Sequence, residues 1–165
     1  MKPLALTGRI LYSLIFIFAG PGHFGANEIA YAAAQGVPLA KLAVPASGIL
    51  ALLGGLSIAL GYRTRWGAAA VVVFLVPVTI AMHNFWAVTD PMMAQIHMAM
   101  FVKNVSLIGG ALFIAYAGAG PLSLDARAQA RKASTGSAAG ASGDPPSLLA
   151  GRPAATRAGA SSSRA

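Results

Sequence analysis

The sequence contains no cysteine. A chain without thiols forms no disulfide, thiolate zinc site, iron–sulfur cluster or thiol redox centre of its own. Charge is scarce as well, because only 10 % of the residues are Asp, Glu, Lys or Arg, whereas a soluble domain carries roughly 25 %. Acidic residues are the rarest, with four against 12 basic ones. These absences exclude thiol chemistry and argue against a soluble domain.

Apolar residues make up 56 % of the chain, and the mean hydropathy is +0.67. They gather in runs long enough for the roughly 20 residues that a helix needs to cross a bilayer. The predicted fold is an all-α polytopic membrane protein, a bundle of four transmembrane helices, because a helix satisfies its own backbone in lipid. The four predicted spans are residues 9–26, 42–60, 66–86 and 96–118.

The first run resembles a signal peptide, since Lys2 precedes an apolar stretch. Cleavage would discard a glycine-rich turn and His23, and three more spans follow. We therefore interpret it as the first span.

Basic residues flank the apolar runs and do not cluster on a polar, aromatic-bearing domain. The net charge of +8 therefore predicts membrane topology and no nucleic-acid partner. Lys and Arg concentrate before residue 10, at 63–65 and after 126. The expected location is the bacterial inner membrane, with both termini and the 61–65 loop cytoplasmic and the loops 27–41 and 87–95 outside.

Two segments outside the spans have distinct character. In the loop 27–41, an apolar side of Ile29, Ala33 and Val37 predicts a short interfacial helix on the outer face. Residues 126–165 are rich in Ala, Gly, Ser, Pro and Arg and lack aromatics. We expect them to form a disordered cytoplasmic tail after a membrane domain of residues 1–125.

Most polar residues of the spans fall at one depth. Lys103 lies seven residues after Ile96, about 10 Å below the membrane surface at 1.5 Å per residue. The other polar residues lie at the outer ends of their runs. The sequence thus predicts one polar pocket in the outer leaflet, formed by His23, Glu28, His83, Trp86, Lys103 and Asn104.

Each of these residues also has a structural interpretation. Lys103 shares a helix face with Ser106, Leu107 and Gly110, which predicts that it faces the packed side; alternatively its amine reaches outward to the interface. The histidines could bond headgroups or backbone carbonyls. No HxxxH or ExxH pair is present, so no metal site is expected. Trp86 is most simply an aromatic anchor at the interface.

Several stretches together resemble the DoxX family of small bacterial inner-membrane proteins. GRILYSLIFIFAGPGHF is similar to the family's opening helix, and YAAAQGVP to its outer loop. LLGGLSIALGYRTRWGAA resembles the second helix, basic loop and start of the third helix. HNFW and FVKNVSLIGGALFIAYAGAGPLSLD are similar to the later signatures. The likeness covers about residues 8–125.

The resemblance implies a four-helix membrane protein, and some relatives are linked to quinol oxidase or thiosulfate:quinone oxidoreductase complexes. The matching residues are His83 and Trp86 in HNFW, and Lys103 and Asn104 in FVKN. Many members have a glutamate where this chain has Ala51. That difference removes one acidic partner for Lys103 and leaves Glu28 as the candidate at the membrane edge.

Three functions remain open on this evidence. The first is a quinone-associated or redox-complex membrane subunit, with Lys103, His83 or Asn104 donating to quinone oxygens. It would have no covalently bound cofactor and would need protein partners for electron transfer. The second is a non-catalytic scaffold for soluble redox or sulfur-transfer enzymes, and the third a small-solute or lipid-handling protein, for which a homo-oligomer could form the path. Whether the protein is an enzyme is not determined by the sequence; an enzymatic role would be as a subunit of a quinone-linked oxidoreductase.

Overall fold

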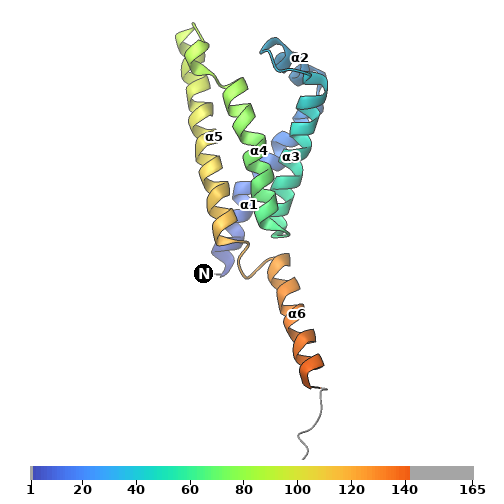
Figure 1. Cartoon of the computed structure of the whole chain (residues 1–165). Helices are drawn as coiled ribbons and strands as arrows, with labels where there is room; N and C mark the ends of the chain where they lie inside the picture. Colours follow the sequence, from blue (N-terminus) through green and yellow to red (C-terminus); the bar gives the residue numbers. More distant parts are fainter. Residues whose placement is uncertain (1, 142–165) are drawn as a thin grey trace, which may run out of the picture. The chain divides into compact units, whose positions relative to one another are not determined.

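The computed structural model describes residues 2–141. The chain divides into two compact units, Met1–Arg131 and Lys132–Ala165. The described part of the second unit is helical. The helices and the two 3-10 turns (η), shown in Figure 1, are in order α1 (Lys2–Ala19), η1 (Gly20–Phe24), α2 (Ala26–Ala34), α3 (Ala40–Leu60), α4 (Thr64–Met82), η2 (Phe85–Ala87), α5 (Pro91–Ala117) and α6 (Leu124–Ala141).

Four helical segments within the described residues are long and apolar enough to cross a membrane: Lys2–Phe24, Ala40–Leu60, Thr64–Ala87 and Pro91–Ala117. They confirm the four-span prediction, with shifted boundaries. The first helix begins at Lys2 rather than near Arg9, and the last begins at Pro91, which Asp90 caps by accepting a hydrogen bond from the Met93 N–H at 2.8 Å.

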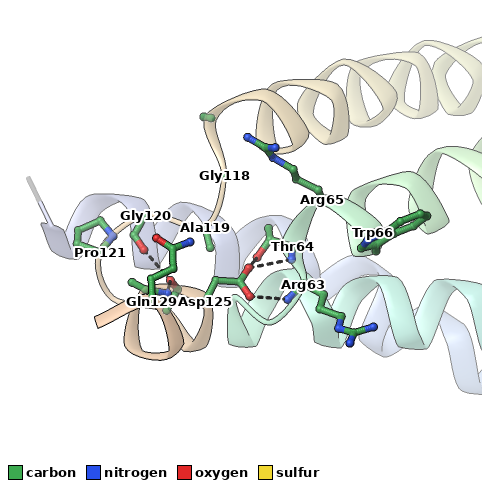
Figure 2. Close-up of a pocket in the computed structure, with 13 residues that line it drawn as sticks. Arg63, Thr64, Arg65, Trp66, Gly118, Ala119, Gly120, Pro121, Asp125 and Gln129 are labelled. Carbon is green, nitrogen blue, oxygen red and sulfur yellow. Dashed lines mark hydrogen bonds between the residues drawn. The ribbon is translucent and has the colours of Figure 1, made fainter. Parts of the chain in front are cut away.

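A helix occupies the beginning of the segment expected to be a disordered tail. The hydroxyl of Ser123 accepts a hydrogen bond from the Ala126 N–H at 3.1 Å and so caps α6. Alanine, arginine and glutamine, which have high helix propensity, then continue the helix to Ala141. Figure 2 shows that the chain after Gly118 passes beside the start of α4, where Asp125 meets Arg63 and Thr64. The predicted disorder of residues 142–165 lies outside the described residues.

Small residues of α3 let α1 and α4 approach it closely. A Cβ added at Gly54 would lie 2.8 Å from a Val71 methyl of α4, and one added at Gly55 would lie 2.9 Å from Phe16 of α1. Ala51 is fully buried between them. Close backbone approach of this kind drives helix association in lipid, where apolar burial alone gives little.

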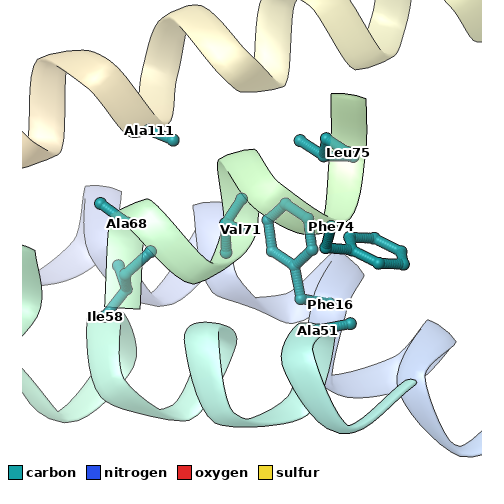
Figure 3. Packing of buried hydrophobic residues seen from close by; sticks show 8 residues of the cluster. All are labelled: Phe16, Ala51, Ile58, Ala68, Val71, Phe74, Leu75 and Ala111. Atoms are coloured by element: carbon teal, nitrogen blue, oxygen red, sulfur yellow. The ribbon is translucent and has the colours of Figure 1, made fainter. Parts of the chain in front are cut away.

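The apolar core joins α1, α3, α4 and α5 (Figure 3). The rings of Phe16 and Phe74 meet edge to face, with their centroids 6.3 Å apart. Such an aromatic pair adds attraction beyond its buried area. The core residues are Phe16, Ala51, Ile58, Ala68, Val71, Phe74, Leu75 and Ala111.

Helix α5 is the least embedded span, and its packed face differs from the expected one. Its only buried residues are Asn104 and Ala111, seven apart and so on one face. Of the residues expected to share the packed face, Lys103 and Ser106 are exposed, whereas Leu107 packs against the core and a Cβ added at Gly110 would lie 2.8 Å from the Tyr12 ring. The helix is rotated by about one residue from the expected setting, so that Asn104 rather than Lys103 faces the interior.

The short helix predicted in the loop 27–41 is present as α2. Ile29 and Val37 pack, as expected, against a small cluster that contains Ala40 and Val44. Ala32, and not Ala33, is the alanine that this contact buries. The side of α2 that faces the bundle is therefore one residue away from the expected one.

Candidate functional site

A cavity of about 250 Å³ lies among α1, η1, α2, α4 and α5, at the end of the bundle that carries α2. Phe16, Phe74 and Leu75 line its inner wall. The structure brings five residues of the predicted pocket to this one cavity, which we call the polar cavity. They are His23, Glu28, His83, Lys103 and Asn104.

Asn104 is the most deeply placed polar group of the cavity. Its side chain is 4 % exposed and lines the cavity from α5. Within the described residues its amide has no hydrogen-bond partner. Its polar atoms are not fully enclosed by protein, because they reach the surface of the cavity. Asn104 therefore presents one donor group and one acceptor to whatever occupies the cavity.

Lys103 lies at the rim of the polar cavity and is exposed. Its amine contacts the Met100 sulfur at 3.4 Å. No carboxylate of the described residues forms an ion pair with it, and Glu28, which lines the same cavity from α2, is also exposed. The cavity thus opens to the surface between a cation and an anion that are not in contact.

The histidines differ in how firmly they are held. The Nδ1 atom of His23 lies 3.1 Å from the Ala19 carbonyl oxygen. Its ring packs edge to face against the Phe74 ring, with the two centroids 5.5 Å apart. His83 lines the cavity, and its ring packs edge to face against the ring of His97, with the two centroids 5.8 Å apart. His97 lies outside the lining, and its Nδ1 is buried without a hydrogen-bond partner. Across residues 2–141, no three His, Asp or Glu side chains gather as a metal site.

A second, mostly apolar cavity of about 190 Å³ adjoins the first. Four residues line both cavities: His23, Glu28, Val78 and Met82. The remaining wall comes from α2, α3 and α4, including Val44 and Pro77. A polar compartment next to an apolar one suits an amphiphilic ligand.

Trp86 does not reach the polar cavity. Its ring packs against Phe85 and Phe101, with centroids 5.2 and 5.8 Å away. It remains 60 % exposed. This position agrees with an aromatic anchor better than with a ligand-binding residue.

A polar network at the opposite end of the bundle was not expected from the sequence. Arg9 of α1 is only 5 % exposed. Its guanidinium donates to the carbonyls of Ala119 and, at 2.7 Å, Leu122. The arginine therefore ties the first helix to the chain that follows α5. The sequence shows Arg9 only as a basic residue at the start of the first predicted span, and nothing there indicates its burial.

Asp125 completes this network by capping another helix. Its carboxylate accepts hydrogen bonds from the backbone N–H groups of Arg63 at 2.8 Å and Thr64 at 3.1 Å, and from the Thr64 hydroxyl (Figure 2). Partial burial raises the pKa of Asp125, but these bonds and the charge of Arg9 outweigh it, so that the pKa lies below the usual value. Arg63 has a left-handed backbone, with φ 47, which this carboxylate helps to hold.

Comparison with known proteins places this architecture among bacterial membrane proteins. Residues 4–84 match the family model described as DoxX. The inner membrane protein YphA of Escherichia coli (strain K12) is 32 % identical over 126 residues, which cover 75 % of this chain and 89 % of YphA. The inner membrane protein YqjF of the same organism is 32 % identical over 124 residues, covering 73 % of this chain and 88 % of YqjF.

A more distant similarity extends to a eukaryote. The ER-derived vesicles protein ERV29 of Saccharomyces cerevisiae is 30 % identical over 77 residues, which are 47 % of this chain and 24 % of that protein. No solved structure matches the chain.

Proposed function

The chain belongs to the DoxX family of integral membrane proteins, and on that premise we propose that its polar cavity binds the head group of a membrane quinone. The protein would serve as a membrane subunit of a quinone-linked redox complex. The observation that carries the proposal is Asn104, a buried amide without a partner that faces a cavity. A quinone carbonyl supplies the acceptor that such a donor lacks.

The polar side chains have separate roles in this proposal. Asn104 donates to one quinone carbonyl from the wall of the cavity. Lys103, at the rim, donates to an oxygen that lies nearer the surface. His83 lines the cavity, so its imidazole is placed to exchange a proton with the bound ring.

The apolar groups fit the rest of such a ligand. Phe16 and Phe74 offer aromatic faces to a flat ring. The adjoining apolar cavity, next to Val78 and Met82, gives space for the first part of an isoprenoid tail. Electrons would come from a partner protein, because the chain has no cysteine and no redox group of its own.

The test uses the full chain purified in mild detergent. Organic extraction followed by mass spectrometry identifies any copurified quinone, and titration with a soluble ubiquinone or menaquinone analogue measures its affinity. Asn104→Leu keeps the side chain's size and removes both polar atoms. We expect it to weaken analogue binding about tenfold or more, as for the loss of one good buried hydrogen bond.

Ser106→Ala is the matched control, since Ser106 lies on the same helix, is exposed and is not part of the cavity lining. Equal binding by the wild type and Asn104→Leu would refute the proposed head-group site. Extraction of phospholipid alone, with no binding of either analogue, would favour a lipid-handling function instead.

A further inference from the structure

A further cavity lined by charged residues lies at the other end of the bundle and has no part in the proposed quinone site. Its volume is about 640 Å³. The start of α4 forms one side, and the chain from the end of α5 to the beginning of α6 forms the other (Figure 2). The charged and aromatic side chains of its lining are Arg63, Arg65, Trp66 and Asp125.

The two arginines of this cavity have no acidic partner. Among the described residues, the acidic side chains are Glu28, Asp90 and Asp125. Asp125 binds the backbone of Arg63 and not its guanidinium, and Figure 2 shows the Arg65 side chain extending toward the chain at Gly118. Arg63 has only a cation–π contact at 5.8 Å with its neighbour Tyr62. Figure 2 shows the Arg63 side chain extending away from that chain, so Arg65 is the arginine that faces across the cavity.

The position of the cavity indicates where that anion comes from. The span Thr64–Ala87 begins between the two arginines, so they lie at the boundary between hydrocarbon and headgroups. Trp66, which is 77 % exposed, lies beside them on the first turn of α4. Tryptophan and arginine together at a helix end are typical of the lipid headgroup layer.

We propose that this cavity binds the phosphate of an anionic phospholipid, held by Arg65, with Arg63 adding positive charge nearby and Trp66 against the upper acyl chains. Arginine suits this role because its planar guanidinium forms paired hydrogen bonds with phosphate oxygens. The carboxylate of Asp125 does not prevent binding, since it already accepts from three donors and Arg9 lies near it.

The test follows the fluorescence of Trp66 in nanodiscs. The chain has two tryptophans, so Trp86→Phe leaves Trp66 as the single reporter. Phosphatidylglycerol with brominated acyl chains is titrated into phosphatidylcholine discs, and the quenching gives its relative affinity for the cavity. The reference experiment uses brominated phosphatidylcholine.

We expect phosphatidylglycerol to quench at a mole fraction about tenfold lower than phosphatidylcholine. The double variant Arg63→Gln, Arg65→Gln should remove that preference, and Arg65→Lys, which keeps the charge, should keep part of it. Arg127→Gln is the matched control, because Arg127 is exposed at the same end and is not part of the lining. Circular dichroism checks that each variant is folded.

Three outcomes would overturn the proposal. Equal quenching by the two lipids would show that there is no anionic preference. An equal loss in Arg127→Gln would show a general charge effect instead of a site. Competition by inorganic phosphate beyond that of sodium chloride at the same ionic strength would identify a free-phosphate site. None of these results bears on the quinone proposal, whose cavity lies at the α2 end.

Discussion

The polar groups at the two ends of the bundle differ in whether they have hydrogen-bond partners. At the Arg63 end, the buried Arg9 donates to two carbonyls, and Asp125 accepts from three donors. At the α2 end, the Asn104 amide has no partner among the described residues, and Lys103 meets only a sulfur. The Arg9 Nε–H is the exception at the Arg63 end, because it is buried without a partner. Hydrogen bonds that join distant segments hold the fold, whereas an unpaired polar group that faces a cavity is available to a ligand.

The largest effect is expected from Arg9→Met. The change leaves the Ala119 and Leu122 carbonyls without their donor and Asp125 without a neighbouring cation. We expect a loss of about 3 kcal/mol in the free energy of unfolding, as for removing one partner of a buried charged network. Thermal unfolding in detergent measures it. Lys41→Met, at an exposed lysine, should change little; an equal loss in both would deny the network its role.

Asp125→Ala should cost about 1–2 kcal/mol, because it removes the cap of α4 and a tie between distant segments. Asp90→Ala, which removes a local cap of α5, is the matched comparison at the other end and should cost less, about 1 kcal/mol. Chemical unfolding of both variants in one detergent compares the two ends directly. A greater loss of unfolding free energy for Asp90→Ala than for Asp125→Ala would contradict the expected difference between the two ends.

The contribution of Asp125 should also depend on pH. Its pKa is lowered in the folded state, so its stabilisation is complete above the unfolded pKa, about 3.9, and is lost as the pH falls through the folded value. The stability difference between the wild type and Asp125→Ala should therefore be constant near neutrality and shrink below about pH 4. A difference that grows on acidification would contradict the assigned bonds.

Asn104→Leu should have the opposite sign in ligand-free protein. Because the amide has no partner to lose, its replacement by an apolar side chain of similar size should leave stability unchanged or raise it by up to about 1 kcal/mol. Ser106→Ala provides the exposed control on the same helix. Strong destabilisation by Asn104→Leu would mean that the amide holds the fold, and the difference between the ends would disappear.

The smallest effect is expected from Lys103→Met. The lysine is exposed and contacts only the Met100 sulfur, so the change in unfolding free energy should stay within about 0.5 kcal/mol. The same unfolding assay measures it. A loss several times larger would show that Lys103 has a structural partner at the α2 end.

The number and order of the spans could be predicted because apolar length alone decides them. The gathering of His23, Glu28, His83, Lys103 and Asn104 at one end also followed from the sequence, since antiparallel spans bring alternate helix ends together. The rotation of α5 could not be predicted from the sequence. That helix is apolar nearly all round, so no polar side marks its outer face. The sequence therefore does not show that Asn104, and not Lys103, faces the interior.

The network at the Arg63 end could not be predicted for a different reason. Its members, Arg9, Thr64 and Asp125, come from widely separated segments, and no local spacing links them. Basic residues at span ends were attributed to membrane topology alone. Likewise, the start of α6 was assigned to a disordered tail on composition, although Ser123 supplies a helix cap. The bonds of Arg9 and Asp125 are tertiary, so no local pattern reveals them, whereas the Ser123 cap is a local bond between residues three apart.

The bond from Arg9 to Leu122 also constrains the order in which the membrane domain can assemble during synthesis. It joins residues 113 apart, near the beginning and the end of the membrane domain. During synthesis, α1 enters the bilayer long before its carbonyl partners have left the ribosome. The buried arginine must therefore stay solvated near the membrane surface until the whole of α5 has been inserted. A nascent chain that stops before residue 122 would contain transmembrane helices in which the bond from Arg9 to Leu122 cannot yet form.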